Sequence, residues 1–384
     1  MSLSRRQFLS RTSTSALAVP ILVTAGADLC EAAPAPASDV DLSMGFPEGA
    51  IRLCFNENTL GPSQKAIAGA MAAVPDSYRY ALSALLRPFL AKYHGLEKEW
   101  ILMGNGSTEV LTLTPIAFMR NGGNVVGTLE TWDEMLAIAD NMGKTVKRVN
   151  LLKQKSYAYD IDGMLAAVDS DTRLFMVISP NNPTGSCVGY PDLKKIADTL
   201  PKKVLFVIDE AYADYLPDGK TAIDLIREGY RNVLVTRTFS KAHALAGLRC
   251  GYGMAHPDVL EEIKKFGCGP GSINLAVFGA VQGSLDDPAH TERSRAHVRA
   301  AHSYYEQQCK KLGLEFVAGP SPFCLIGVGE GKGKAVQNEL RKQKIFINDG
   351  GHWHLPGFIR VSYGRENENQ AFFNGLTSVM QGKT

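Results

Sequence analysis

Two apolar runs, each ended by a polar turn, constrain the fold more than any other feature of this sequence. One run, LFMVI from Leu174, leads into SPNNPTG, and the other, VLFVI from Val204, leads into DEAYADY. Apolar runs without polar alternation are typical of strands buried on both faces of a parallel sheet. The runs alternate with helical patterns, which predicts an α/β fold with a mostly parallel sheet. Ligands of such sheets bind outside the carboxyl ends of the strands, so the polar residues there are candidates for a site.

A lysine follows in the segment TFSKAHALAGLRCGYG, which starts at Thr238. The amine of Lys241 becomes a nucleophile toward aldehydes when apolar or cationic neighbours lower its pKa. The Ser240 hydroxyl and the Arg249 guanidinium are donors that suit a phosphate dianion. An aldehyde that carries a phosphate is pyridoxal 5′-phosphate, so the segment predicts this cofactor, held by Lys241 as a Schiff base. Taken alone, the segment fits a lysine on a solvated loop better.

The polar residues at the strand ends strengthen the prediction. Asp209 can pair with the pyridine nitrogen of the cofactor and keep the ring an electron sink. Tyr212, three residues later, can reach the phenolic oxygen of the ring. Asn182 ends the other apolar run, although NNPTG also fits an ordinary tight turn.

Two earlier segments add weaker signals. GNGSTE, from Gly104, is a glycine-rich turn that opens a helix near Ser107 and Thr108. The N–H groups and the dipole at such a helix start can bind phosphate, but capped starts of this kind are common. Trp132 follows an apolar strand and can stack on a flat ring or belong to the core.

In their order along the chain, these segments resemble the fold type I pyridoxal-phosphate enzymes, and most closely the histidinol-phosphate aminotransferase family. The resemblance implies a large domain with a mostly parallel sheet and a smaller α+β domain toward the C-terminus. The matching segments are NENTLGPS at Asn56, YRY at Tyr78, GNGSTE at Gly104, NNPTG at Asn181, DEAYADY at Asp209, TFSKAHALAGLRCGYG at Thr238 and FIRVSYG at Phe358.

The resemblance implies a role for each matching cofactor residue. Lys241 would be the catalytic lysine, and Asp209 would hold the pyridinium. Asn182 and Tyr212 would bind the phenolic oxygen, while Trp132 would cover the ring. The residues implied for the phosphate are Ser107, Thr108, Ser240 and Arg249, together with Tyr80 from the neighbouring subunit of a homodimer.

The resemblance also implies the substrate contacts. Arg360 would bind the acidic group of the substrate through a bidentate fork, the alternative being a solvated arginine at a strand edge. Asn58 would be a further substrate contact. The family usually has a second arginine where this chain reads Ile347, Asn348 and Asp349. This departure makes histidinol phosphate doubtful and favours a free amino acid.

The predicted function is therefore an aminotransferase that moves the amino group of a free L-amino acid to a 2-oxo acid by a ping-pong exchange. Three alternatives stay open: an oxidase, decarboxylase or lyase on the same fold, a true histidinol-phosphate aminotransferase, and an inactive exported binding protein. No metal site is predicted, because His352 and His354 have no third clustered ligand.

The first residues predict export. Arg5 and Arg6 precede a modest apolar stretch and the run AAPAPAS, which is the layout of a twin-arginine signal over residues 1–37. A disordered tail or a signal anchor are the alternatives. The mature enzyme is expected in the periplasm, without stable membrane insertion after cleavage.

Composition and element patterns set the remaining expectations. The 41 basic and 39 acidic residues give a formal charge of +2, which predicts neither nucleic-acid nor membrane-surface binding. The patterns place an N-terminal arm and first helix at 38–75, a large cofactor-binding domain at 76–285 and a small C-terminal domain at 286–384. Asp286, Asp287 and Pro288 mark the last boundary.

Overall fold

The computed structural model describes residues 44–382 of the chain. The site and its scaffold belong to the unit Gly49–Thr384. The predicted export signal, with Arg5 and Arg6, lies outside the described residues. Every helix within the described residues is too short or too polar to span a bilayer.

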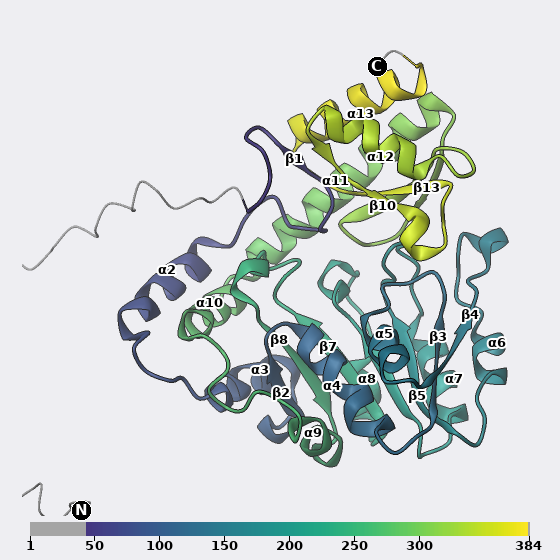
Figure 1. Ribbon diagram of the computed structural model, residues 1–384. Helices are drawn as coiled ribbons and strands as arrows, with labels where there is room; N and C mark the ends of the chain where they lie inside the picture. The colour runs from purple at the N-terminus through teal and green to yellow at the C-terminus, as the bar shows by residue number, and fades with distance from the viewer. Residues whose placement is uncertain (1–43, 383–384) are drawn as a thin grey trace, which may run out of the picture. The chain divides into compact units, whose positions relative to one another are not determined.

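A seven-stranded sheet forms the centre of the Gly49–Thr384 unit, in the order β2-β8-β7-β6-β5-β3-β4. All neighbouring strands are parallel except at β8, which runs antiparallel to β2 and to β7. The prediction of an α/β fold with a mostly parallel sheet is therefore confirmed (Figure 1). The strands are β2 (Ile101–Gly104), β3 (Asn124–Thr128), β4 (Thr145–Val149), β5 (Thr172–Ile178), β6 (Leu205–Asp209), β7 (Val233–Thr238) and β8 (Gly251–Ala255).

Helices cover both faces of this sheet. Along β5, Phe175 and Val177 point into one apolar core, whereas Leu174, Met176 and Ile178 point into the other. The alternation of side chains along a strand thus turns one continuous apolar run into the inner wall of two cores. One core is closed by α4 (Ser107–Met119), α5 (Glu134–Asn141) and α9 (Pro257–Lys264), and the other by α3 (Arg87–His94), α6 (Ile161–Ala166), α7 (Tyr190–Thr199) and α8 (Ile223–Arg227).

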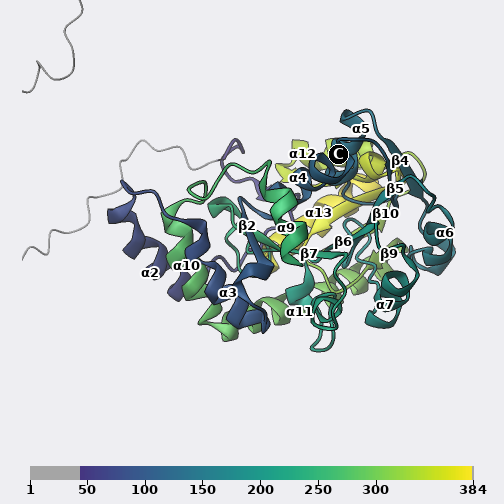
Figure 2. The same ribbon diagram turned by 90° about the horizontal axis from the view of Figure 1, so that it is seen from below.

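Two further helices, α2 (Gln64–Ala73) and α10 (Leu275–Leu285), lie side by side away from the sheet (Figures 1 and 2). They approach so closely that a Cβ atom built on Gly279 would lie 1.9 Å from the carbonyl oxygen of Gly69. Only glycine allows two helix backbones to come this near. Among the described residues, α2 lies inside the 38–75 segment for which the sequence predicts a helix.

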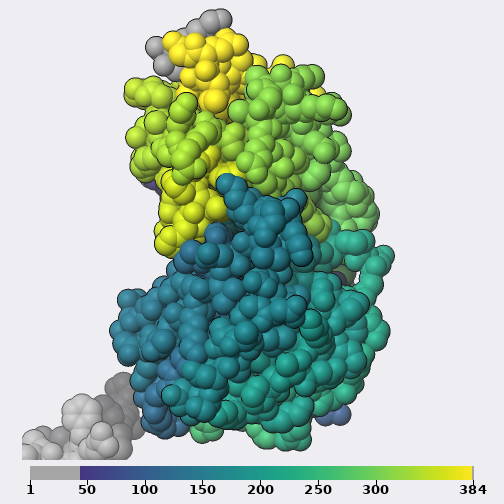
Figure 3. All heavy atoms as spheres, turned by 90° about the vertical axis from the view of Figure 1, so that its right-hand side faces the viewer, coloured from purple at the N-terminus to yellow at the C-terminus, as the bar shows by residue number. Residues whose placement is uncertain are grey.

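A smaller α+β region follows the break at Asp286 and Asp287. Its antiparallel sheet has the order β12-β13-β10-β9, and its core contains Tyr305, Phe323 and Phe372. Figure 3 shows the atoms of this yellow-green region abutting the blue and teal residues of the preceding α/β region. The elements are α11 (Pro288–Leu312), β9 (Glu315–Ala318), β10 (Phe323–Gly327), α12 (Gly333–Lys342), β11 (Ile345–Phe346), β12 (Asn348–Asp349), β13 (Phe358–Ser362) and α13 (Glu366–Met380).

Residues 51–58 form an N-terminal strap against this C-terminal region. Within the strap, β1 (Ile51–Arg52) pairs in parallel with β11, and Leu53 is fully buried in the core of the smaller region. The carbonyl oxygen of Leu53 accepts a hydrogen bond of 2.9 Å from the Ser362 N–H. The strap therefore joins residues that are about three hundred positions apart, which no local pattern in the sequence indicates.

Candidate active site

The carboxyl ends of three neighbouring strands bring the predicted residues together. In the register of the sheet, Ile178 at the end of β5 pairs with Asp209 at the end of β6, and Asp209 pairs with Thr236 on β7. Asn182 follows β5 by four residues, and Lys241 follows β7 by three. Because parallel strands end at one edge of a sheet, residues that lie far apart in sequence share this edge.

Asp209 is a buried carboxylate, and its side chain is only 3% exposed. Burial raises its pKa to about 6, against the lowering effect of hydrogen bonds from the Thr236 hydroxyl and the Ala211 N–H. Thr236 Oγ1 donates to Asp209 Oδ1 at 2.8 Å. Among the described residues, no side chain forms an ion pair with Asp209, so its charge suits a cationic group that the chain does not supply.

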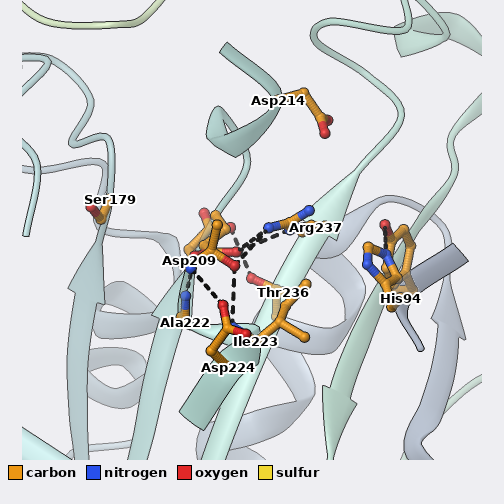
Figure 4. A network of polar contacts seen from close by, with 12 residues as sticks. His94, Ser179, Asp209, Asp214, Ala222, Ile223, Asp224, Thr236 and Arg237 are labelled. Carbon is orange, nitrogen blue, oxygen red and sulfur yellow. Dashed lines mark hydrogen bonds and ion pairs between the residues drawn. The ribbon is translucent and has the colours of Figure 1, made fainter. Parts of the chain in front are cut away.

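The next residue, Glu210, is paired instead. Its Oε2 accepts from Arg237 Nε at 2.9 Å and from Nη2 at 2.7 Å, and Oε1 accepts from the Ala222 N–H. Figure 4 shows this network converging beside Asp209 and Thr236. Arg237 is therefore committed to Glu210, which leaves Asp209 available to a ligand.

Lys241 lies above these strand ends and is partly buried. Its Nζ donates to the carbonyl oxygen of Phe55 in the strap at 2.9 Å and lies 5.7 Å from the centre of the Tyr212 ring. Burial and then the charge of Arg360 lower the pKa of the lysine to about 8, although the Glu57 and Asp209 carboxylates oppose the shift. Part of the amine is thus neutral near physiological pH, which nucleophilic attack on an aldehyde requires.

Four of the predicted phosphate residues lie around the start of α4, namely Ser107, Thr108, Ser240 and Arg249. Arg249 Nη1 lies 3.4 Å from Ser240 Oγ, and Nη2 lies 3.5 Å from the carbonyl oxygen of Asn105. Gly106, the residue before the helix, has φ +81, and a Cβ there would lie 2.5 Å from Arg249. Its lack of a side chain leaves a cradle beside the first N–H groups of the helix, of which Ser107 is the first. Three hydroxyls, a guanidinium and a helix start are the donors that a phosphate dianion needs, so the residues fit the cofactor.

Arg360 reaches the site from β13 in the smaller region. Its Nη1 donates to Asn182 Oδ1 at 2.8 Å, and Nη2 donates to the Cys54 carbonyl oxygen in the strap. The Nε atom is buried and has no hydrogen-bond partner among the described residues. Burial lowers the pKa of the guanidinium to about 10, so it stays charged at neutral pH. The centre of the Trp353 ring lies 4.7 Å from Arg360 Cζ.

The other predicted residues take different positions. Trp132 is partly buried, and its backbone N–H donates to the Asn182 backbone carbonyl oxygen at 2.6 Å. Both residues therefore stand at one edge of the site. Asn58 lies beside the lysine, but its Nδ2 donates to the Ala242 carbonyl oxygen and to Ser294 Oγ. The structure thus uses this amide to hold the strap, and its substrate contact stays a prediction. Tyr80 is 92% exposed, and among the described residues it makes no hydrogen bond or ring contact with a predicted site residue.

The sequence reasoning missed Asn56, which lies in the strap and contacts the site directly. This side chain is 1% exposed and donates from Nδ2 to the Tyr212 hydroxyl at 2.9 Å. The only local signal is its place in the NEN run, in which the family resemblance points to Asn58 rather than to Asn56. Among residues 44–382, no three His, Cys, Asp or Glu side chains gather in a way that could hold a metal ion.

The fold and the residues gathered at its strand ends define the class, which is a fold type I enzyme that uses pyridoxal 5′-phosphate. The family described as aminotransferase class I and II matches residues 48–376, and the chain belongs to this family. It is therefore a pyridoxal-phosphate-dependent aminotransferase.

Similar proteins carry a more specific description. The chain is 34% identical to histidinol-phosphate aminotransferase 1 of Cupriavidus pinatubonensis, over 90% of this chain and 93% of that protein. It is 32% identical to histidinol-phosphate aminotransferase of Symbiobacterium thermophilum, over 90% and 94%. Among solved structures, histidinol-phosphate aminotransferase from Sinorhizobium meliloti, in complex with pyridoxal 5′-phosphate, has a TM-score of 0.80 and 25% identity, covering 87% of this chain and 91% of that one.

The lowered pKa of Lys241 leads to a first prediction. In the cofactor-free protein, acylation of Lys241 should rise with a midpoint near pH 8, well below the value of about 10.4 for a lysine in a model peptide. Arg360→Ala should move the midpoint upward, because removal of the positive charge favours the protonated amine. Mass spectrometry of the labelled peptide gives both midpoints. A midpoint at or above that of a peptide lysine would show that the site does not activate the amine.

Proposed function

We propose that the enzyme transfers the amino group of a free L-amino acid to a 2-oxo acid, with the carboxylate of either substrate bound by Arg360. One observation carries the proposal: the residue opposite Arg360 in the small sheet is Asn348, with which it pairs directly in register. Asn348 Nδ2 donates to the Cys54 carbonyl oxygen, the same atom that accepts from Arg360. A single guanidinium beside a neutral amide matches the charge of one carboxylate better than that of a phosphate dianion.

The residues of the chain would divide the work as follows. When bound, pyridoxal 5′-phosphate supplies an electron sink for the charge left at the substrate Cα. The Asp209 carboxylate would keep the ring nitrogen protonated, and Asn182 and Tyr212 would hold the phenolic oxygen. Lys241 would hold the cofactor and then move the proton at the substrate Cα. The remaining roles follow from position: Ser107, Thr108, Ser240 and Arg249 would bind the phosphate, and Trp132 would cover the ring.

The second candidate substrate is histidinol phosphate, which the names of the similar proteins favour. Both candidates need the same cofactor residues, and they differ in the acidic group that the small region must bind. The position of Asn348 is therefore where the two can be separated.

The substrate proposal predicts a preference that one substitution should change. The wild-type enzyme should convert at least one free L-amino acid with a kcat/KM about tenfold or more above that for histidinol phosphate, which corresponds to about 1.4 kcal/mol. Asn348→Arg should raise kcat/KM for histidinol phosphate, because it adds a second cation beside Arg360. Absorbance of the bound cofactor in single turnovers, over a panel of both substrates, measures this preference.

Asn348→Gln serves as the matched control, since it changes the side-chain length without adding charge. A wild-type preference for histidinol phosphate would refute the free amino acid. Failure of every donor would instead count against the transamination.

We also propose that the enzyme works as a homodimer in which each subunit completes the site of the other. Apolar side chains stand exposed along the segment that follows α2, where Tyr78 is 75% exposed and Tyr80 is 92% exposed. Leu82, Leu85 and Phe89 are exposed in the same stretch. Large apolar side chains that gather on one surface are typical of a protein interface. Tyr80 would reach the cofactor phosphate of the partner subunit.

A mixed dimer tests both parts of this proposal. Lys241→Ala and Tyr80→Ala should each be nearly inactive alone, because every site lacks either its lysine or the tyrosine from its partner. After subunit exchange at equal amounts, activity should rise to about a quarter of wild type, since half of the dimers are mixed and each holds one intact site. Assays before and after exchange measure the recovery. No recovery would show that Tyr80 acts within its own subunit, and an active Tyr80→Ala variant before exchange would show that Tyr80 has no role in the site.

Finally, we propose that the enzyme is exported to the periplasm through the twin-arginine route. The support is the sequence alone, in which Arg5 and Arg6 precede an apolar stretch and a small-residue run. Replacement of both arginines by lysine should keep the precursor in the cytoplasm, and cell fractionation with the mass of the product measures the outcome. An unchanged periplasmic fraction of the double variant would argue against this route.

A further inference from the structure

Asn56 stands where three distant parts of the chain meet. It belongs to the strap, it contacts Tyr212 after β6, and it contacts Ser362 at the end of β13. The residue is almost fully buried and has φ +55, a left-handed conformation that asparagine and glycine adopt more readily than other residues. A buried amide in this conformation needs every hydrogen-bonding atom to be used.

The direction of each hydrogen bond around Asn56 follows from one group that can only donate. The backbone N–H of Asn56 donates to Ser362 Oγ at 2.8 Å. The single hydrogen of the Ser362 hydroxyl then goes to Asn56 Oδ1 at 2.9 Å. This fixes the amide, so Nδ2 faces Tyr212 and donates to its hydroxyl oxygen at 2.9 Å. The reverse amide orientation would press two donors against Ser362 Oγ and leave the serine hydrogen without an acceptor among the described contacts.

The phenol of Tyr212 is thereby left with its own hydrogen to donate. Burial raises the pKa of Tyr212 to about 12, so the group stays protonated at neutral pH. Within residues 44–382, Asn56 is the one hydrogen-bond partner of the Tyr212 hydroxyl. Since Asn56 Nδ2 occupies the oxygen as a donor, the phenol hydrogen must point to another acceptor. Lys241 Nζ lies 5.7 Å from the ring centre, so the phenol stands next to the place of the cofactor.

We propose that Asn56 is a positioning residue, locked by Ser362, which makes the Tyr212 phenol a hydrogen-bond donor toward the phenolic oxygen of the cofactor ring. The inference rests on the proposed contact of Tyr212 with that oxygen. A donated hydrogen bond stabilises the ionised form of an oxygen. Asn56 thus favours the anionic ring oxygen without touching the cofactor.

The hydrogen bonds between Asn56 and Ser362 also link the Tyr212 side of the site to the Arg360 side. Ser362 lies two residues after Arg360 on β13, and the Cys54 carbonyl oxygen that accepts from Arg360 lies two residues before Asn56 in the strap. A shift of the strap would therefore disturb the arginine and the phenol together.

The test uses Asn56→Gly, because glycine keeps the positive φ, removes the amide and adds no charge. We expect the pH midpoint of the absorbance change of the bound cofactor to rise by about one unit, and the dissociation constant of the cofactor to rise about tenfold. Tyr212→Phe should give shifts of the same sign. In the Asn56→Gly/Tyr212→Phe double variant, both the pH midpoint and the dissociation constant of the cofactor should be almost the same as in Tyr212→Phe alone.

Ser362→Ala provides a second route if the glycine variant does not fold. It removes the lock while it keeps both the amide and the phenol, and it should raise the midpoint in the wild-type background but not in the Tyr212→Phe background. Far-ultraviolet circular dichroism and thermal melting of the cofactor-free proteins check that each variant folds.

The outcomes separate this inference from the proposed function. A glycine shift that persists in full with Tyr212→Phe would overturn the inference, because Asn56 would then act independently of the phenol. A shift with Tyr212→Phe and none with Asn56→Gly or Ser362→Ala would overturn it as well. If Tyr212→Phe itself changes neither quantity, the proposed contact of Tyr212 with the cofactor fails, and the inference fails with it.

Discussion

The buried charge of Asp209 is the constraint on which the rest of the site depends. A carboxylate that is almost fully buried, with no ion-pair partner among the described residues, is costly unless a cation arrives from outside the chain. The protein keeps this charge available by pairing the neighbouring Glu210 with Arg237 and by supporting Asp209 with a neutral hydroxyl from Thr236. In the function proposed above, the pyridinium of the cofactor would supply the missing charge. The fold thus keeps a negative charge without an ion-pair partner among the described residues at the end of β6, and such a charge favours the binding of a cation.

The strap organises the opposite side of the site. Its backbone carbonyl oxygens at Cys54 and Phe55 accept hydrogen bonds from Arg360 and Lys241, and its Asn56 side chain contacts the Tyr212 phenol. One short extended segment therefore touches the lysine, the arginine and the phenol. Its register is set by pairing with β11 and by burial of Leu53, which are packing requirements rather than chemical ones.

Much of this arrangement could be predicted from local signals. The apolar runs ending at Ile178 and Asp209 indicate strands covered on both faces, and the structure places both in the middle of a seven-stranded sheet. The break at Asp286 and Asp287 separates α10 from α11, where the Asp287 side chain caps the second helix. The strap and Asn56 could not be predicted in this way. The side-chain partners of Asn56 are Tyr212 and Ser362, which lie 156 and 306 residues away in the chain. The residues around an asparagine in an NEN run do not indicate partners at such distances.

The sequence by itself determined the class of sheet and the cofactor, and it predicts Lys241 as the lysine that holds the cofactor, since each depends on residues close together in the chain. Tertiary structure alone decided which charges are already paired, that Asn56 donates to the Tyr212 phenol oxygen, and that Asn348 stands opposite Arg360. The reason is physical. Strand burial and lysine chemistry are encoded by neighbours along the chain, whereas a pKa, a hydrogen-bond direction or the charge of a binding pocket depends on groups that only folding brings within a few ångströms.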